Sequence, residues 1–208
     1  MKISCKNIQF SYPQQKTLIR SLNLEVSSGE KLWIKGRSGS GKSSFLKLLA
    51  GLLTPSQGEV QIEDTLISKL SDSEKRKFRF DHIGYTHQEN HLIDHWTLEQ
   101  NLTLFTEDNS LILEILNAVD LPKELLKSRV ADLSGGEKQR LSLARLILQK
   151  PKIALIDEPT SHLDDENTEK LMTYLLKKLK DSTFIVVSHD HRLEKFPFKA
   201  LQFGEINL

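Results

Sequence analysis

The chain has 208 residues, enough for one large domain or for a domain with a subdomain. Its 29 basic and 28 acidic residues leave a formal net charge of +1, so no overall field favours nucleic acid or an anionic membrane surface. The single cysteine, Cys5, excludes an internal disulfide and a cysteine cluster for metal, which suits a reducing cytoplasm. No apolar run approaches the ~20 residues needed to span a bilayer, so any membrane role must come through a partner.

The amino-terminal part predicts an antiparallel sheet. Residues 1–10 alternate imperfectly and predict an edge strand, whereas residues 22–26 alternate cleanly, as a half-buried strand does. Residues 59–62 predict another short strand. The charged segment 71–80 predicts an exposed helix, and residues 198–208 alternate around a glycine and predict a hairpin.

Short apolar segments elsewhere predict the strands of a buried sheet. Residues 153–156 and 183–187 are continuously apolar, which is typical of strands buried on both faces, and residues 31–35 predict a further strand. Between residues 89 and 150 the apolar spacing is helical and no strand is indicated. The sequence therefore predicts an α/β fold with an N-terminal antiparallel part and an inserted helical subdomain. The predicted core comprises residues 1–88 and 151–208, and the subdomain residues 89–150.

Residues 36–43 read GRSGSGKS, and the rest of the chain is organised around them. Glycines let several backbone N–H groups converge on a phosphate chain, where side chains would block the approach. Lys42 supplies a point charge to the β/γ-phosphates, and the Ser43 hydroxyl is a Mg²⁺ ligand. A strand precedes the loop and a helix follows it, so an anion site is favoured over a flexible glycine–serine turn. The ATP contacts predicted here are Gly36, Arg37, Ser38, Gly39, Ser40, Gly41, Lys42, Ser43 and Ser44.

Residues 83–88 predict a further strand, which ends in Gln88. Two of the apolar strands are likewise followed by polar residues: the pair Asp157 and Glu158, and His189. In an open α/β sheet, ligands bind at the carboxyl ends of the strands, so these residues should gather at one edge. Asp157 suits the carboxylate on the Mg²⁺ side of a phosphate-loop NTPase, and Glu158 suits a general base. An Asp-Glu-Pro strand terminus is ordinary by itself, and the phosphate loop is what favours the functional interpretation.

Residues 133–137, LSGGE, lie between the phosphate loop and the Asp-Glu pair and resemble the signature of ATP-binding-cassette (ABC) ATPases. Together with the other motifs, the resemblance covers essentially the whole chain. It implies a single ABC ATPase domain over residues 1–208, built on a phosphate-loop (RecA-like) core, that binds and hydrolyses ATP with Mg²⁺. The compact length and the context LSGGEKQR are most similar to small export or lipoprotein-release-type cassettes.

The same resemblance implies residue roles. Gln88 stands in the place of the Q-loop glutamine, which senses Mg²⁺ and the γ-phosphate, and His189 in that of the switch histidine. Tyr12 stands where an aromatic residue stacks on adenine, with a plain edge aromatic as the alternative. His162 replaces the small residue usual in the D-loop, residues 161–164. The residues implied to reach the ATP of a partner protomer are Ser134, Gly135, Gly136, Glu137 and Asp164.

As to partners, the resemblance implies an ATP-dependent homodimer, or a heterodimer with another ABC subunit, acting on an integral membrane permease. It places the chain in the cytoplasm, peripheral on the cytoplasmic face of the inner cell membrane, and no nucleic acid is expected. Cargo, direction of transport and the identity of the permease stay open. Two other readings also stay open: an ABC subunit that signals through a membrane partner without transport, and a soluble nucleotide-dependent switch. The long insertion of chromosome ATPases and a second cassette are both missing from these 208 residues.

Overall fold

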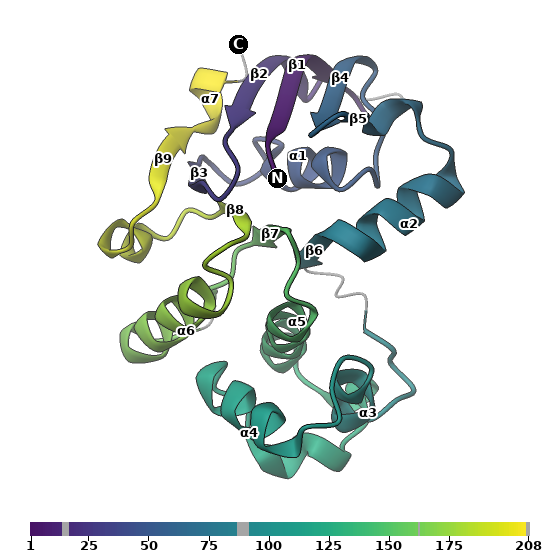
Figure 1. Ribbon diagram of the computed structural model, residues 1–208. Coiled ribbons are helices and arrows are strands. Elements are labelled where there is room, and N and C mark those ends of the chain that lie inside the picture. The colour runs from purple at the N-terminus through teal and green to yellow at the C-terminus, as the bar shows by residue number, and fades with distance from the viewer. Residues whose placement is uncertain (14–16, 87–91, 162, 207–208) are drawn as a thin grey trace. The chain divides into compact units, whose positions relative to one another are not determined.

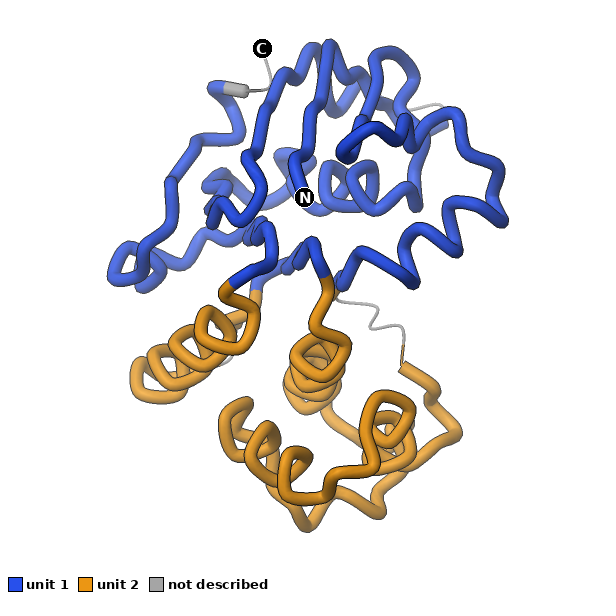
Figure 2. The backbone as a smooth tube through the Cα atoms, viewed as in Figure 1, with its two compact units in different colours: residues 1–85, 152–158, 181–208 blue, residues 86–151, 159–180 orange. Residues whose placement is uncertain are grey.

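The computed structural model describes residues 1–13, 17–86, 92–161 and 163–206, which form two compact units (Figure 2). The first unit comprises residues 1–85, 152–158 and 181–208, and the second comprises residues 86–151 and 159–180. The second unit thus contains residues 159–180, which the sequence-based division assigned to the core. Each unit is described below by itself.

An antiparallel sheet of four strands forms one layer of the first unit (Figure 1). Its strands are β1 (Ile3–Phe10), β2 (Ile19–Val26), β4 (Gln57–Ile62) and β5 (Thr65–Leu66), in the order β2-β1-β4-β5. The prediction that residues 1–10 form an edge strand is wrong, because Ile3 pairs with Val26 on one side and with Ile62 on the other. Alternation along a strand reports which face is buried, but pairing at its two edges depends on segments far away in sequence.

The second sheet of this unit has the strand order β6-β7-β8-β3-β9. Its strands are β3 (Lys31–Lys35), β6 (Ile83–Thr86), β7 (Ile153–Asp157), β8 (Thr183–Val187) and β9 (Lys199–Gln202). Pairing is parallel between β7 and β8, between β8 and β3, and between β3 and β9. The predicted hairpin at residues 198–208 is wrong: β9 pairs with β3, and the chain then turns into the short helix α7 (Phe203–Ile206). Phe203 is 1% exposed, so burial of this side chain accompanies the turn.

One apolar core joins the two sheets to helix α1 (Lys42–Leu49), which follows the glycine-rich loop. Apolar side chains of α1, Phe45 and Leu49 among them, are fully buried beside inward-facing residues of both sheets, such as Ile8 of β1 and Leu155 of β7. Figure 1 shows α1 beneath the antiparallel strands. The packing fixes the direction of α1, and hence the place where its first N–H groups point.

Helix α2 (Asp72–His82) confirms the exposed helix predicted at residues 71–80, and none of its residues is buried. It begins in a capping box, in which the Ser71 side chain accepts from the Glu74 N–H and the Glu74 carboxylate accepts from the Ser71 N–H. The first unit also contains two short 3₁₀ helices, η1 (Ile67–Lys69) and η4 (His191–Lys195).

The second unit is helical, as predicted for residues 89–150. It contains α3 (Leu98–Thr103), α4 (Asn109–Ala118), α5 (Gly135–Gln149) and α6 (Asp165–Lys178), with the 3₁₀ helices η2 (Lys123–Lys127) and η3 (Val130–Asp132). Helix α6 is tied to α4 by polar contacts, since Glu114 accepts from the Tyr174 hydroxyl at 2.9 Å and pairs with Lys178 at 3.0 Å. Among the described residues, no helix is both long and apolar enough to cross a membrane.

Candidate functional site

The register of the parallel sheet brings three strand ends to the same level. Val187, at the end of β8, lies opposite Asp157 of β7 on one side and Ile34 of β3 on the other. The segments that leave these strands are the glycine-rich loop, Glu158, and the pair Ser188 and His189. Within the first unit, the loop, Glu158 and His189 thus leave the sheet at its carboxyl edge. Gln88, which the same expectation placed there, lies outside the described residues.

The glycine-rich loop has the backbone that its composition requires. Gly41 has a φ of 103°, and a Cβ atom there would lie 3.0 Å from Cγ of Leu18. Gly36 is closely packed as well, because an added Cβ would lie 3.2 Å from both Phe203 Cβ and Ser40 Oγ. The loop delivers the chain directly into α1, so the unpaired N–H groups at the start of that helix point toward the loop and favour an anion there.

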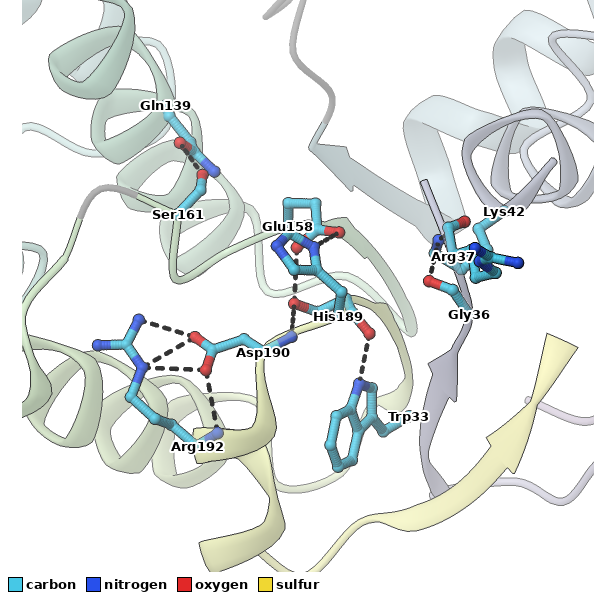
Figure 3. A network of polar contacts seen from close by, with 11 residues as sticks. Trp33, Gly36, Arg37, Lys42, Gln139, Glu158, Ser161, His189, Asp190 and Arg192 are labelled. Carbon is cyan, nitrogen blue, oxygen red and sulfur yellow. Dashed lines mark hydrogen bonds and ion pairs between the residues drawn. The ribbon is translucent and has the colours of Figure 1, made fainter. Parts of the chain in front are cut away.

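Lys42 folds back over the loop and is only 7% exposed. Its ammonium group donates to the carbonyl oxygens of Gly36 at 2.8 Å and of Arg37 at 2.9 Å (Figure 3). Burial holds the pKa of this ammonium below its usual value, and the negative charges of Glu158 and Asp157 oppose that shift. The two hydrogen bonds thus hold a positive charge at the loop.

Asp157 and Ser43 supply a donor set that fits Mg²⁺. The Asp157 side chain is 6% exposed and is hydrogen-bonded to the Ser43 hydroxyl. The pKa of this carboxyl is raised, mainly by burial. The hydrogen bond with Ser43 and the charge of Lys42 oppose the rise, whereas the charge of Glu158 adds to it. A buried carboxylate and a hydroxyl are the hard oxygen ligands that Mg²⁺ takes beside phosphate oxygens. The adjacent Ser40 hydroxyl is also buried and has no hydrogen-bond partner among the described residues.

Glu158 lies beside this set, and its carboxylate is held at both oxygens (Figure 3). Oε2 accepts from the Ser188 hydroxyl at 2.6 Å, and Oε1 lies 2.8 Å from Nδ1 of His189. The side chain of Glu158 is 17% exposed, whereas that of His189 is 74% exposed. The backbone of Glu158 is left-handed, with a φ of 47°, which is uncommon for a residue other than glycine. A strained residue whose carboxylate is this firmly oriented suits a proton acceptor.

Tyr12 lies next to the start of α1. Its hydroxyl shares a hydrogen bond of 3.0 Å with Ser44, and its ring meets Phe10 edge to face with the centroids 4.9 Å apart. The ring is half-buried, and the contact with Ser44 keeps it near the loop. Stacking on adenine stays a prediction. Arg37, Ser38 and Gly39 form the exposed outer turn of the loop.

The signature segment lies in the second unit and begins helix α5. Ser134 is the N-cap, and the Glu137 carboxylate accepts from both the N–H and the hydroxyl of Ser134 at 2.7 Å. Gly135 and Gly136 form the first turn, and an added Cβ on Gly135 would meet nothing within 4 Å. At Gly135, therefore, no described residue covers the amino-terminal end of the helix, and the Glu137 carboxylate of the same chain is already bound at its cap.

Of the remaining predicted residues, Asp164 is the N-cap of α6, and its side chain accepts from the Asn167 N–H at 2.8 Å. The neighbouring Ser161 donates to the Gln139 side chain of α5 at 2.8 Å, which ties the D-loop segment to the signature helix within the second unit (Figure 3). Gln88 and His162 lie outside the described residues.

A pocket of about 560 Å³ opens beside the phosphate loop in the first unit. Its lining includes the loop residues Gly36, Arg37 and Ser40, together with His189 and Phe203. It therefore gives access to the loop backbone and to the exposed His189 from the same side.

Two residues of this network, Ser188 and Trp33, were not predicted from the sequence as members of the site. Trp33 is 1% exposed, and its indole N–H donates to the carbonyl oxygen of Ser188 at 3.0 Å. A polar residue between a buried strand and a site histidine is the signal that could have singled out Ser188.

Comparison with known proteins decides the family. Residues 19–161 match the family described as "ABC transporter". The lipoprotein-releasing system ATP-binding protein LolD of Francisella tularensis subsp. tularensis (strain FSC 198) is 35% identical over 223 aligned residues, which cover 99% of this chain and 96% of that protein. The chain belongs to the ABC transporter family. It is accordingly an ATP-binding and ATP-hydrolysing subunit, with Mg²⁺ as the cofactor general to that family.

Solved structures of ABC transporter cassettes agree with this fold. The dimeric structure of MJ0796, a bacterial ABC transporter cassette, has a TM-score of 0.84 and 32% identity, covering 96% of this chain and 94% of that one. A post-hydrolysis dimer of MJ0796 bound to ADP and Pi matches with the same score and identity, covering 96% and 93%. A bacterial Atm1-family exporter with ATP bound has a TM-score of 0.78 at 23% identity over 97% of this chain and 36% of that one, a likeness of fold alone.

Proposed function

We propose that this chain acts as one of two ATPase subunits that close around two Mg·ATP and thereby drive a separate membrane-spanning subunit. One arrangement supports this most: the chain has two segments suited to bind an anion, and they belong to different units. The first unit holds the phosphate loop of residues 36–43, and the second holds the amino-terminal end of α5 at Ser134. One γ-phosphate does not need two cradles from one chain, whereas a head-to-tail dimer uses both.

In this proposal Lys42 and the N–H groups of the loop bind the β- and γ-phosphates, and Tyr12 stacks on the adenine. Ser43 and Asp157, with Gln88, would hold Mg²⁺, which supplies charge neutralisation at the phosphates when bound. The partner protomer contributes its signature residues, Ser134 to Glu137, and its Asp164. To engage a phosphate, the Ser134 hydroxyl has to exchange the Glu137 carboxylate for a phosphate oxygen.

Hydrolysis then follows from the arrangement at the end of β7. The oxygen of a water attacks the γ-phosphorus, and the bond from that phosphorus to the β–γ bridging oxygen breaks, which releases ADP and phosphate. The water proton passes to the Glu158 carboxylate, which is oriented by Ser188 and His189. His189, exposed and next to the loop pocket, contacts the γ-phosphate and the Glu158 carboxylate together.

We further propose a place on the cytoplasmic face of a membrane and lipid-anchored proteins as the cargo class. Support for the cargo comes from the relatives of near-equal length, which are named for lipoprotein release.

Coexpression of the tagged chain with the polytopic membrane protein encoded in the neighbouring reading frame tests the assembly. The two should copurify in mild detergent, and ATP hydrolysis by the complex in vesicles should rise when a lipidated protein is supplied.

Copurification without cargo-dependent transport would favour the signalling alternative, and failure of any membrane protein to associate would favour a soluble switch. An unlipidated form of the same cargo protein is the matched control, because it differs only in the acyl chains that the proposed transporter would recognise.

A further inference from the structure

Ser188 makes an unusual number of hydrogen bonds for one small residue. It follows the last residue of β8 and is fully buried. Its hydroxyl donates to Oε2 of Glu158 at 2.6 Å and accepts from the N–H of Asp190 at 3.1 Å. A hydroxyl has one proton to donate, so the bond accepted from Asp190 leaves that proton directed at Glu158.

The backbone of Ser188 is fixed as firmly as its side chain. Its N–H donates to the carbonyl oxygen of Ile34 at 3.3 Å, and its carbonyl oxygen accepts from the Trp33 indole at 3.0 Å. Ile34 and Trp33 belong to β3, the strand that leads into the phosphate loop. Ser188 is therefore held in place by β3, the strand that also leads into the proposed phosphate site.

The second contact of the Glu158 carboxylate is weaker as an anchor. His189 lies 2.8 Å from Oε1, but its ring is 74% exposed, so water competes for the same hydrogen bond. Both contacts are made to the carboxylate, but the Ser188 contact is shielded from water, which makes it the stronger of the two.

We propose that Ser188 is a positioning residue for hydrolysis, which holds the Glu158 carboxylate at the carboxyl edge of the sheet, with Trp33 fixing Ser188 in turn. The inference rests on the proposed function, in which Glu158 accepts the proton of the attacking water. Ser188 touches neither water nor nucleotide in this proposal and acts only through Glu158.

The experiment measures kcat, KM and ATP affinity of the full chain bearing Ser188→Ala, Ser188→Cys or Ser188→Thr. Ser188→Ala removes the donor, Ser188→Cys keeps the volume with a weak donor, and Ser188→Thr restores a hydroxyl. We expect kcat to fall roughly 10- to 100-fold for Ala and Cys, with KM and ATP affinity near wild type, because a misplaced base slows only the chemical step. Thr should recover most of kcat.

Two further variants complete the experiment, one as a control for the loss of a buried serine and one as a test of the Trp33 contact. Ser182→Ala removes another buried serine, which precedes β8 at its opposite end, and should leave kcat unchanged. Trp33→Phe keeps an aromatic ring but removes the indole donor, and should lower kcat by less than Ser188→Ala does. Thermal denaturation of each variant separates loss of fold from loss of turnover.

A double-mutant cycle with Glu158→Gln distinguishes the inference from the function beneath it. If Ser188 acts through Glu158, Ser188→Ala lowers the residual turnover of Glu158→Gln no further. Wild-type kcat in Ser188→Ala, full activity in Ser188→Cys, or additive losses in the cycle would each overturn the role of Ser188 while leaving the ATPase assignment intact. If Glu158→Gln alone hydrolysed ATP at the wild-type rate, Glu158 would not be the base, and the inference about Ser188 would fail with it.

Discussion

The ammonium nitrogen of Lys42 lies 2.8 Å from the carbonyl oxygen of Gly36, so this side chain joins the two ends of the phosphate loop. A second bond to the Arg37 carbonyl at 2.9 Å uses another of its three N–H donors. The loop thus positions its own cation with two of the three donors. In the proposed function, Lys42 would supply charge at the phosphates and also hold the shape of the loop that receives them.

Replacing Lys42 by alanine should therefore weaken ATP binding strongly. We expect affinity to fall roughly 10- to 100-fold or more, since a buried charge-assisted contact is lost together with the closure of the loop. Isothermal titration calorimetry measures this directly. Lys69→Ala, which removes an exposed cation on η1, is the matched control and should bind as wild type does. Unchanged ATP binding by Lys42→Ala would contradict the assignment of the loop.

The exchange of Asp157 for asparagine tests the Mg²⁺ ligands. Wild-type protein should bind ATP more tightly with Mg²⁺ than with EDTA, and in Asp157→Asn that ratio should fall toward one because the charged oxygen ligand is gone. Calorimetry in the two buffers gives the ratio. Asp64→Asn, at an exposed turn, controls for the change of charge.

The same exchange should raise the melting temperature at neutral pH without Mg²⁺. Burial raises the pKa of Asp157, so the folded protein holds this proton to higher pH than the unfolded chain does. Ionisation of the side chain therefore lowers the free energy of unfolding as the pH rises through that range, and an uncharged asparagine avoids the loss. The difference should vanish below the ordinary aspartate pKa of 3.8, where both side chains are neutral. A neutral-pH melting temperature below that of wild type would count against this account of the buried charge.

Glu158→Gln keeps the size of the side chain and removes its basicity. The variant should bind ATP normally while turnover falls by at least ~100-fold, because the attacking water loses its proton acceptor. A phosphate-release assay at saturating Mg·ATP reports the effect. Glu59→Gln on β4, an exposed acid, should hydrolyse ATP at the wild-type rate. Near-normal turnover in Glu158→Gln would show that another group serves as the base.

The split site predicts that ATP joins two protomers. The Glu158→Gln protein should be largely monomeric without nucleotide and dimeric with ATP, because closure is then not undone by hydrolysis. Adding Ser134→Arg should abolish the dimer yet leave ATP binding to the monomer intact, since Ser134 serves the nucleotide of the partner. Light scattering with and without ATP measures both states.

A control for that variant is available within the chain. Ser71 caps α2 with the same capping box that Ser134 forms on α5, so Ser71→Arg loses an equivalent cap and gains the same charge. It should dimerise with ATP as the parent does. A stable ATP-bound dimer of the Ser134→Arg variant, or loss of ATP binding by its monomer, would mean that the signature acts within its own chain.

Local chemistry made the nucleotide site readable from the sequence. Glycine spacing, a lysine and a hydroxyl define the phosphate loop within eight residues, and capping residues such as Ser134 and Ser71 mark helix starts within four. A fully apolar strand indicates burial on both faces, so Asp157 and Glu158 at the end of one such strand could be predicted as site residues. These features depend on neighbours along the chain, so no tertiary information was needed.

What the sequence left undetermined involves partners distant in sequence. The predicted edge strand lies inside its sheet, and the predicted hairpin is a parallel strand on β3, because pairing edges are chosen by segments tens to hundreds of residues away. The link from Trp33 through Ser188 to Glu158 spans three strands and is visible only once their parallel register is known. The residues of the chemistry were thus legible in the sequence, whereas the hydrogen bonds that orient them arise from the tertiary structure alone.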